Sequence, residues 1–232
     1  MWILIKGFTL SSLVLCALSV CEISFLNTAV ANPAHTKKHG VPHSAKDFYE
    51  RGITRDESGD KKGAIADFTM ALKINPNYAE PHNARGFVLN QLGDKNGAMA
   101  DFTMALQINP NYAVAYNNRG QLREDNGDFQ GELDDYNRSI QINPNLKITY
   151  KNRAFLYELF KNKQGAIDDY TQVIRIDPQD EIAYYFRAKL RAETGDKQGA
   201  IADYQKVVAL SSAKDEPKTH QDALNQIKLL QK

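Results

Sequence analysis

Histidine is the residue type whose spacing first suggests chemistry in this chain. His35, His39 and His43 recur every fourth residue. On a helix that spacing would place three imidazoles on one face, which can bind zinc or copper. Gly40 and Pro42 interrupt the segment, and no carboxylate or cysteine completes the set of ligands. The sequence therefore predicts a solvated basic segment here and no metal site.

The sequence carries no recognisable catalytic motif. It has no G-x-S-x-G, no H-E-x-x-H, no glycine-rich phosphate loop and no C-x-x-C, which are the common signatures of nucleophilic, metal-dependent and phosphoryl chemistry. His82 and His220 lack a nucleophile at a defined spacing, and we expect His82 to be a packing residue. The chain is predicted to be non-enzymatic and to need no cofactor.

Charge and cysteine content exclude further classes of protein. Lys and Arg number 29 against 28 Asp and Glu, a formal charge of +1, so no general attraction to nucleic acid is expected. The only cysteines are Cys16 and Cys21. If the amino-terminal segment that holds them is removed, neither a disulfide framework nor a thiolate metal site is possible.

Residues 1–31 have the features of a secretory signal peptide. Lys6 supplies a positive start, residues 8–20 form an apolar run, and Ala29-Val30-Ala31 is an A-x-A cleavage site. Two alternatives are an uncleaved membrane anchor, which Glu22 interrupts, and a lipid attached to Cys21. We predict cleavage, export to the periplasm or an equivalent lumenal or secreted compartment, and no membrane span in the mature chain.

The rest of the chain repeats one pattern five times with a period of about 34 residues, a length typical of helix–turn–helix arrays. The blocks span residues 45–78, 79–112, 113–146, 147–180 and 181–214. Residues 32–44 precede them as a flexible leader, because they contain prolines, glycine and lysines without an apolar period. Residues 215–232 follow, and their apolar spacing predicts an amphipathic helix that caps the array.

Four positions are chemically similar from block to block, although the third block departs at Glu132. Position four is Phe48, His82, Tyr116, Tyr150 and Tyr184; position eight is Gly52, Gly86, Gly120, Ala154 and Ala188. Position twenty is Ala64, Ala98, Glu132, Ala166 and Ala200; position twenty-four is Phe68, Phe102, Tyr136, Tyr170 and Tyr204. This pattern resembles the tetratricopeptide repeat (TPR). The resemblance implies an all-α fold, a right-handed α-solenoid of five helix–turn–helix repeats plus a C-terminal capping helix.

Two charged positions are invariant across the blocks. Arginine occupies position seven as Arg51, Arg85, Arg119, Arg153 and Arg187, and aspartate occupies position twenty-three as Asp67, Asp101, Asp135, Asp169 and Asp203. Because cations and anions recur in fixed register, we predict a structural ladder of ion pairs, either within a repeat or across to its neighbour. The alternative is an arginine row that binds an anionic ligand.

The sequence also predicts the turns. Gly-Asp at 59–60, 93–94, 127–128 and 195–196 pairs a helix-ending glycine with an aspartate that can cap the next helix. In the fourth block Lys161-Asn162 stands instead, and we expect Asn162 to take the left-handed conformation. Between blocks, Asn77, Asn111 and Asn145 are expected to cap the following helix. Glycine at position nineteen suggests close approach of two backbones.

In TPR proteins the first helix of each repeat lines a concave groove. The resemblance places the partner-binding groove at Tyr49, Asn83, Phe87, Asn117, Asn118, Gln121, Lys151, Asn152, Phe155, Tyr185 and Lys189, and the same positions include Phe186. An asparagine side chain has both hydrogen-bond donors and an acceptor, so it can bond to the N–H and C=O groups of a peptide backbone. Aromatic residues contribute much of the binding energy at interfaces. The carboxylate clamp of chaperone-docking TPR domains is not assembled, because Phe155 stands where its asparagine belongs.

These features predict an exported, non-enzymatic scaffold that binds a peptide or helix of a partner protein in the groove. Similarity to bacterial TPR proteins favours a role in assembling an envelope or membrane complex. Two alternatives remain, a self-associating structural module that forms homo-oligomers and a carbohydrate- or cell-wall-associated adaptor. The sequence names neither the partner nor the pathway.

Overall fold

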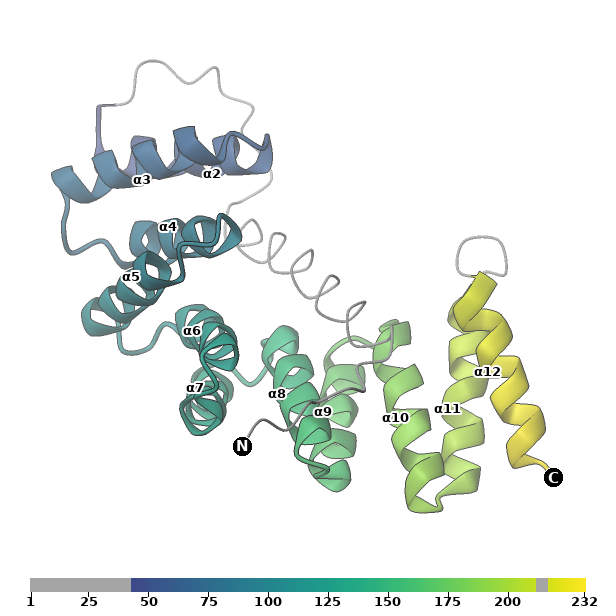
Figure 1. Ribbon diagram of the computed structural model, residues 1–232. Helices are drawn as coiled ribbons and strands as arrows, with labels where there is room; N and C mark the ends of the chain where they lie inside the picture. Colours follow the sequence, from purple (N-terminus) through teal and green to yellow (C-terminus); the bar gives the residue numbers. More distant parts are fainter. Residues whose placement is uncertain (1–42, 212–216) are drawn as a thin grey trace, which may run out of the picture. The chain divides into compact units, whose positions relative to one another are not determined.

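The computed structural model describes residues 43–211 and 217–232, which form helices joined by short turns and contain no strand (Figure 1). The chain separates into two compact units, residues 1–127 and residues 128–232. The predicted signal peptide and nearly all of the predicted leader lie outside the described residues.

The first unit holds five helices within the described residues. They are α2 (Ala45–Glu57), α3 (Lys61–Ile74), α4 (Ala79–Gln91), α5 (Lys95–Ile108) and α6 (Ala113–Asp125). Helices α2 and α3 form one helical hairpin and α4 and α5 the next, and α3 packs on α4 (Figure 1). Each hairpin corresponds to one repeat of the sequence.

The second unit holds six helices in the part of the chain that the structure describes. They are α7 (Phe129–Ile142), α8 (Lys147–Leu159), α9 (Lys163–Ile176), α10 (Glu181–Thr194), α11 (Lys197–Leu210) and α12 (Pro217–Leu230). The pairs α8–α9 and α10–α11 are hairpins, α9 packs on α10, and α12 packs on α11 (Figure 1). The hairpins α8–α9 and α10–α11 fall within residues 147–180 and 181–214, and α12 falls within residues 215–232.

The turn inside each repeat follows the expected chemistry. Gly59, Gly93, Gly127 and Gly195 have φ values between 71° and 91°, a left-handed conformation that costs glycine little. The aspartate after each glycine caps the next helix; Asp60, for example, accepts a hydrogen bond from the backbone N–H of Gly63. The Gly-Asp interpretation is confirmed at all four turns.

The fourth turn departs from the prediction for Asn162. Lys161, which stands in the glycine position, takes the left-handed conformation with φ of 60°. Asn162 instead caps α9 by accepting a hydrogen bond from the backbone N–H of Gly165. The turn keeps its shape. Because Asn162 is needed as the cap, the left-handed position falls on Lys161, where a residue with a Cβ is strained.

The caps predicted between repeats are wrong. Asn77 does not cap α4, because that helix begins at Ala79 and its N-cap residue is Tyr78, whose side chain makes no cap hydrogen bond. The same holds for Asn111 and Asn145, since Tyr112 and Leu146 precede α6 and α8. The asparagine two residues earlier organises the turn: Asn75 Oδ1 accepts a hydrogen bond from the backbone N–H of Asn77, as Asx turns do.

Small residues at position eight let the two helices of a repeat approach closely. A Cβ added to Gly52 would lie 2.5 Å from the Phe68 ring, and one added to Gly86 would lie 3.0 Å from the Phe102 ring. Both rings are buried. The aromatic residue at position twenty-four therefore occupies the space that a side chain at position eight would need.

The glycines at position nineteen have a different cause from the predicted backbone approach. A Cβ on Gly63 would lie 2.0 Å from the carboxylate of Asp60, and Gly97 and Gly199 are crowded in the same way by Asp94 and Asp196. The side chain that caps the helix folds over these glycines. Position nineteen is small because the cap occupies the adjacent space.

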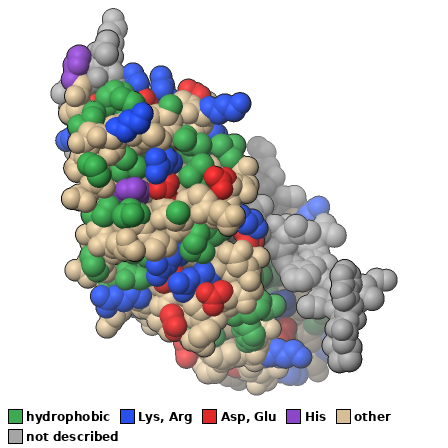
Figure 2. Space-filling model, turned by 60° about the vertical axis from the view of Figure 1, so that its left-hand side comes forward, with side chains coloured by type: hydrophobic (Ala, Val, Ile, Leu, Met, Phe, Trp, Pro, Cys, Tyr) green, Lys and Arg blue, Asp and Glu red, His purple; other side chains and the backbone are tan. Residues whose placement is uncertain are grey.

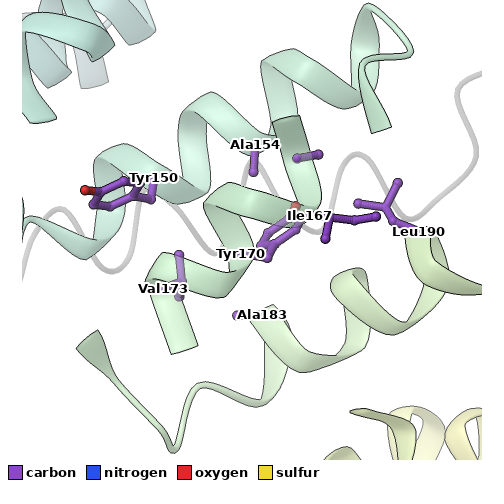
Figure 3. Close-up of a cluster of buried hydrophobic side chains, with 8 residues drawn as sticks. Tyr150, Ala154, Ile167, Tyr170, Val173, Ala183 and Leu190 are labelled. Carbon is purple, nitrogen blue, oxygen red and sulfur yellow. The ribbon is translucent and has the colours of Figure 1, made fainter. Parts of the chain in front are cut away.

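Stacked repeats share one core in the second unit. Tyr150 and Ala154 of α8, Tyr170 and Val173 of α9, and Ala183 of α10 belong to one cluster of buried side chains (Figure 3). No single pair of helices could bury these surfaces, which is why repeats of this size depend on their neighbours.

No helix within the described ranges combines the length and apolar character that a membrane crossing requires.

Candidate partner-binding surface

Four of the five expected arginine–aspartate pairs are ion pairs within a repeat. Each joins position seven to position twenty-three through two hydrogen bonds: Arg51 to Asp67, Arg85 to Asp101, Arg153 to Asp169, and Arg187 to Asp203. The N···O distances lie between 2.6 and 2.8 Å. Arg119 and Asp135 belong to different units, so their pairing stays a prediction.

The arginines also connect neighbouring repeats. Arg153 Nη1 donates to Asn137 Oδ1 at 2.6 Å, and Arg187 Nη1 donates to Thr171 Oγ1 at 3.1 Å. Arg85 makes the same contact with Thr69. Each acceptor belongs to the preceding repeat, so one guanidinium closes its own hairpin and ties it to the one before. These guanidiniums are occupied inside the fold, which leaves the anion-binding alternative without support at these positions.

Buried carboxylates of the ladder differ in their electrostatic balance. Burial alone would raise the pKa of Asp101, but hydrogen bonds from Arg85 and His82 outweigh it and hold the pKa below its ordinary value. At Asp169 burial outweighs the hydrogen bond from Arg153, and the pKa is raised. His82 Nδ1 lies 2.9 Å from Asp101 Oδ1, so this histidine joins the ladder as well as packing.

Cations and anions alternate on the face drawn in Figure 2, where blue and red side chains lie next to one another among green hydrophobic ones. Such mixing agrees with the near-zero net charge of the chain. A surface of this kind lacks the single-sign field with which nucleic-acid-binding proteins attract phosphate.

The predicted groove asparagines of the first unit are buried. Asn83 and Asn117 are each 1% exposed and Asn118 is 3% exposed. Asn118 Nδ2 donates to Asn83 Oδ1 at 3.0 Å, and Asn83 Nδ2 donates to the hydroxyl of Tyr112 at 3.4 Å. These amides join α4 to α6 across 35 residues of sequence, so they hold the repeats together and are not open to a partner.

Other predicted groove residues of the first unit are also partly used by the fold. Phe87 is buried, whereas Tyr49 and Gln121 are half-buried. The Tyr49 ring packs against Phe68 and Tyr78 with centroid distances of 5.9 and 5.5 Å. Burial raises the pKa of Tyr49, so it stays a neutral hydroxyl.

Lys151 in the second unit is an ion-pair partner. Its side chain is 9% exposed, and Nζ lies 2.7 Å from Asp180 Oδ2. Asp180 caps α10 and also receives Lys147 Nζ at 3.3 Å. Lys151 therefore fastens α8 to the start of α10.

The open part of the predicted groove lies on α8 and α10. Asn152 and Phe155 of α8, and Tyr185 of α10, are half-buried, and Lys189 of α10 is exposed. Phe186, which occupies a further groove position, is also half-buried. We call these five residues the α8–α10 face.

Aromatic contacts hold two rings of this face in place. Phe186 stacks on Tyr170 at a centroid distance of 5.8 Å and meets Tyr185 edge-on at 5.5 Å. The Tyr185 hydroxyl donates to Asp222 of α12 at 2.6 Å. Rings fixed in this way lose little side-chain entropy when a partner covers them, which favours binding.

A half-buried acid lies beside the face. Glu158 Oε1 accepts a hydrogen bond from the Tyr170 hydroxyl at 2.8 Å, and burial raises the pKa of Glu158. Lys189 interacts with this carboxyl through charge while its own side chain is exposed. The face therefore offers rigid apolar rings with one exposed cation and one amide at its edges.

The side chains of this face are of kinds that contact peptides. No group of three histidine, cysteine or acidic side chains that could hold a metal occurs among residues 43–211 and 217–232. The rings and the amide can cover an apolar side chain and hydrogen-bond to a peptide backbone.

Comparison with known proteins places the repeats in a family. One model of the tetratricopeptide repeat matches residues 79–112 and 113–146, and another matches residues 161–215. The chain belongs to the tetratricopeptide repeat family. No curated protein matches its sequence. TPR proteins are generally non-catalytic scaffolds for protein interaction, and this chain has that fold.

Solved structures share the helical-repeat fold of this TPR chain. PilF of Pseudomonas aeruginosa is 17% identical, with a TM-score of 0.68 over 80% of this chain and 91% of its own. MamA of Desulfovibrio magneticus is 18% identical, with a TM-score of 0.63 over 76% and 99%. YrrB, described as a TPR protein with an unusual peptide-binding site, is 17% identical, with a TM-score of 0.59 over 80% and 92%. At these identities the similarity shows the fold alone.

Proposed function

We propose that this TPR protein is an exported scaffold that binds a peptide or helix of a partner protein along the α8–α10 face. The observation that carries the proposal is the placement of three half-buried rings, an amide and an exposed lysine on the first helices of adjacent repeats. Aromatic anchors with polar edges are the usual composition of a binding surface.

The proposed binding face contains fewer residues than the groove that the sequence predicts. Asn83 and Asn118 join α4 to α6. Asn117 donates to Asn118, and Lys151 is paired with Asp180. Their contribution to binding is therefore indirect, through the shape of the repeats. Peptide binding by YrrB supports the idea that this fold can take a peptide, without transferring its site to this chain.

Export and a role in assembling an envelope complex are further parts of the proposal. They rest on the apolar run and A-x-A site of residues 1–31 and on the similarity of the repeats to bacterial TPR proteins. Mass spectrometry of the protein purified from its own cells tests the first part. A chain that begins at Asn32 supports cleavage, and an intact residue 1 in the exported fraction contradicts it.

A capture experiment tests the binding face. The bait is the chain from residue 32, used beside a variant with Asn152→Ala, Phe155→Ala and Lys189→Ala. We expect a protein of the envelope extract to bind the unchanged bait and to be depleted at least about tenfold on the variant, because loss of anchor contacts typically costs over about 1 kcal/mol per residue.

A matched control carries Gln141→Ala, Gln205→Ala and Lys206→Ala, three exposed side chains of the second helices. It changes the same number of residues and removes one lysine, as the test variant does. Circular dichroism must first show that all three baits are equally helical. Equal capture by test and control variants would contradict binding at the α8–α10 face.

A further inference from the structure

Helix α12 is attached to the last repeat through one side. Ala223 is fully buried, and Ile227 and Leu230 are partly buried in the cluster that contains Tyr204 and Val207 of α11. On the other side of α12, Gln221, Asn225 and Lys228 are exposed. The helix is amphipathic, and its apolar side packs against α11; Figure 1 shows α12 beside α11.

Two hydrogen bonds fix the position of α12 on this surface. Asp222 Oδ2 accepts from the Tyr185 hydroxyl of α10 at 2.6 Å. His220 Nδ1 lies 3.0 Å from Ser211 Oγ. Because the Ser211 hydroxyl donates to the backbone carbonyl of Val207, its oxygen must accept the proton of His220. Both bonds have a defined donor and acceptor, so they select one register of the helix.

The determinants of this contact are divided between two separate stretches of chain. The receiving surface is made by α10, α11 and Ser211, and everything that it recognises in the contacts above lies within residues 220–230. A helix with the same sequence on another molecule therefore satisfies the surface as well as the chain's own helix does, which is the condition for exchange of an element between copies.

We propose that the surface of α10 and α11 beneath α12 is a helix-binding site whose partner in trans is α12 of a second copy of this chain. Exchange of α12 joins two chains without creating a new interface between other surfaces. Tyr185 belongs both to the α8–α10 face and to this site, but exchange of α12 requires no partner on that face. It gives the self-associating alternative a specific structural basis.

The first test uses a fluorescent peptide with the sequence of residues 217–230 and the full chain. Fluorescence anisotropy should show binding as the peptide replaces the chain's own α12. The full chain with Asp222→Asn should bind the peptide about tenfold more tightly than the unchanged chain. In its own α12 a neutral amide replaces the charged acceptor of the Tyr185 hydroxyl, which weakens that hydrogen bond.

The same substitution in the peptide should have the opposite effect. A peptide with Asp222→Asn should bind about tenfold more weakly, whereas one with Asn225→Ala, on the exposed side, should bind unchanged. A chain with Tyr185→Phe should bind the unchanged peptide and the Asp222→Asn peptide equally well. The proposal would be overturned if the peptide bound to none of the chains. It would also be overturned if the unchanged chain bound the unchanged peptide and the Asp222→Asn peptide with equal affinity.

The second test asks whether a second copy supplies the helix. Chains labelled at the amino terminus with a donor or an acceptor fluorophore are mixed at rising concentration. We expect energy transfer between the two labelled chains. An excess of unlabelled peptide 217–230 should abolish it, and the Asn225→Ala peptide should abolish it equally well. Chains that pair in a way that the peptide does not disturb, or chains that never pair, would contradict exchange of α12.

Discussion

The ion pair between Arg153 and Asp169 gives the most demanding test of how the repeats are held together. Asp169 is 2% exposed, and both of its oxygens accept from Arg153, at 2.7 and 2.8 Å. Replacing Arg153 by methionine keeps much of the volume but leaves this carboxylate buried without that donor. Breaking a buried pair in this way typically costs about 3–5 kcal/mol.

Arg153 also donates to Asn137 of the preceding repeat, so the substitution should loosen both its own hairpin and the contact with α7. We therefore expect Arg153→Met to lower the free energy of unfolding of the second unit by at least about 3 kcal/mol. Urea unfolding followed by circular dichroism at equilibrium measures it.

The double variant Arg153→Met with Asp169→Leu should recover most of the loss, because no charge is then left in the core; apolar replacement of a buried pair is often neutral. Arg138→Met is the matched control, since Arg138 donates to Gln141 on the same helix at an exposed position. A cost for Arg153→Met no larger than that of Arg138→Met would refute the reasoning, as would a double variant less stable than both single variants.

Three further predictions concern local features of the repeats. Lys161→Gly should raise the unfolding free energy by about 0.5–1 kcal/mol, because glycine removes the strain of a left-handed lysine and adds a smaller cost in chain entropy. Thermal and urea unfolding measure this change, and a loss of stability would contradict the assigned turn. Asn75→Ala should destabilise the first unit by about 1 kcal/mol, because it removes the side-chain hydrogen bond of the turn, and Asn77→Ala should destabilise it by less than about 0.5 kcal/mol. The reverse order in urea unfolding would indicate that Asn77 caps the helix. Lys147 holds the pKa of Asp177 below its ordinary value of 3.8, so stability from this pair is present above that pH and is lost as pH falls through the folded-state value. Asp177→Asn, which puts in the residue of the first three repeats, should flatten the fall in unfolding free energy below pH 3.8, and an unchanged slope would contradict the pair.

The 34-residue period made the helices and their pairing predictable. Repeated Gly-Asp dipeptides set the turns, and the recurrence of arginine and aspartate sixteen residues apart indicated the ladder. What the sequence left open was the third contact of each arginine. Its acceptor is Thr in two places and Asn in another, so no constant residue marks position twenty-five.

The groove was less predictable than the fold. The position of a residue within the TPR repeat identifies the helix face on which it lies. It does not show whether the side chain is already bonded to a neighbouring repeat. Asn83 and Asn118 are hydrogen-bonded across 35 residues, and the recurrence of asparagine in adjacent repeats was a signal for such a contact. Phe186 has a groove position in the repeat, but only the structure shows that stacking on Tyr170 makes it one of the rigid rings.

A direct test of the proposed binding face is site-specific photo-crosslinking in living cells. A photoreactive side chain replaces Lys189, and a second variant carries it in place of Lys206 on the exposed side of α11. We expect one envelope protein to be crosslinked to the chain from position 189 and not from position 206. The same product from both positions, or a product from position 206 alone, would contradict a partner site on α8 and α10.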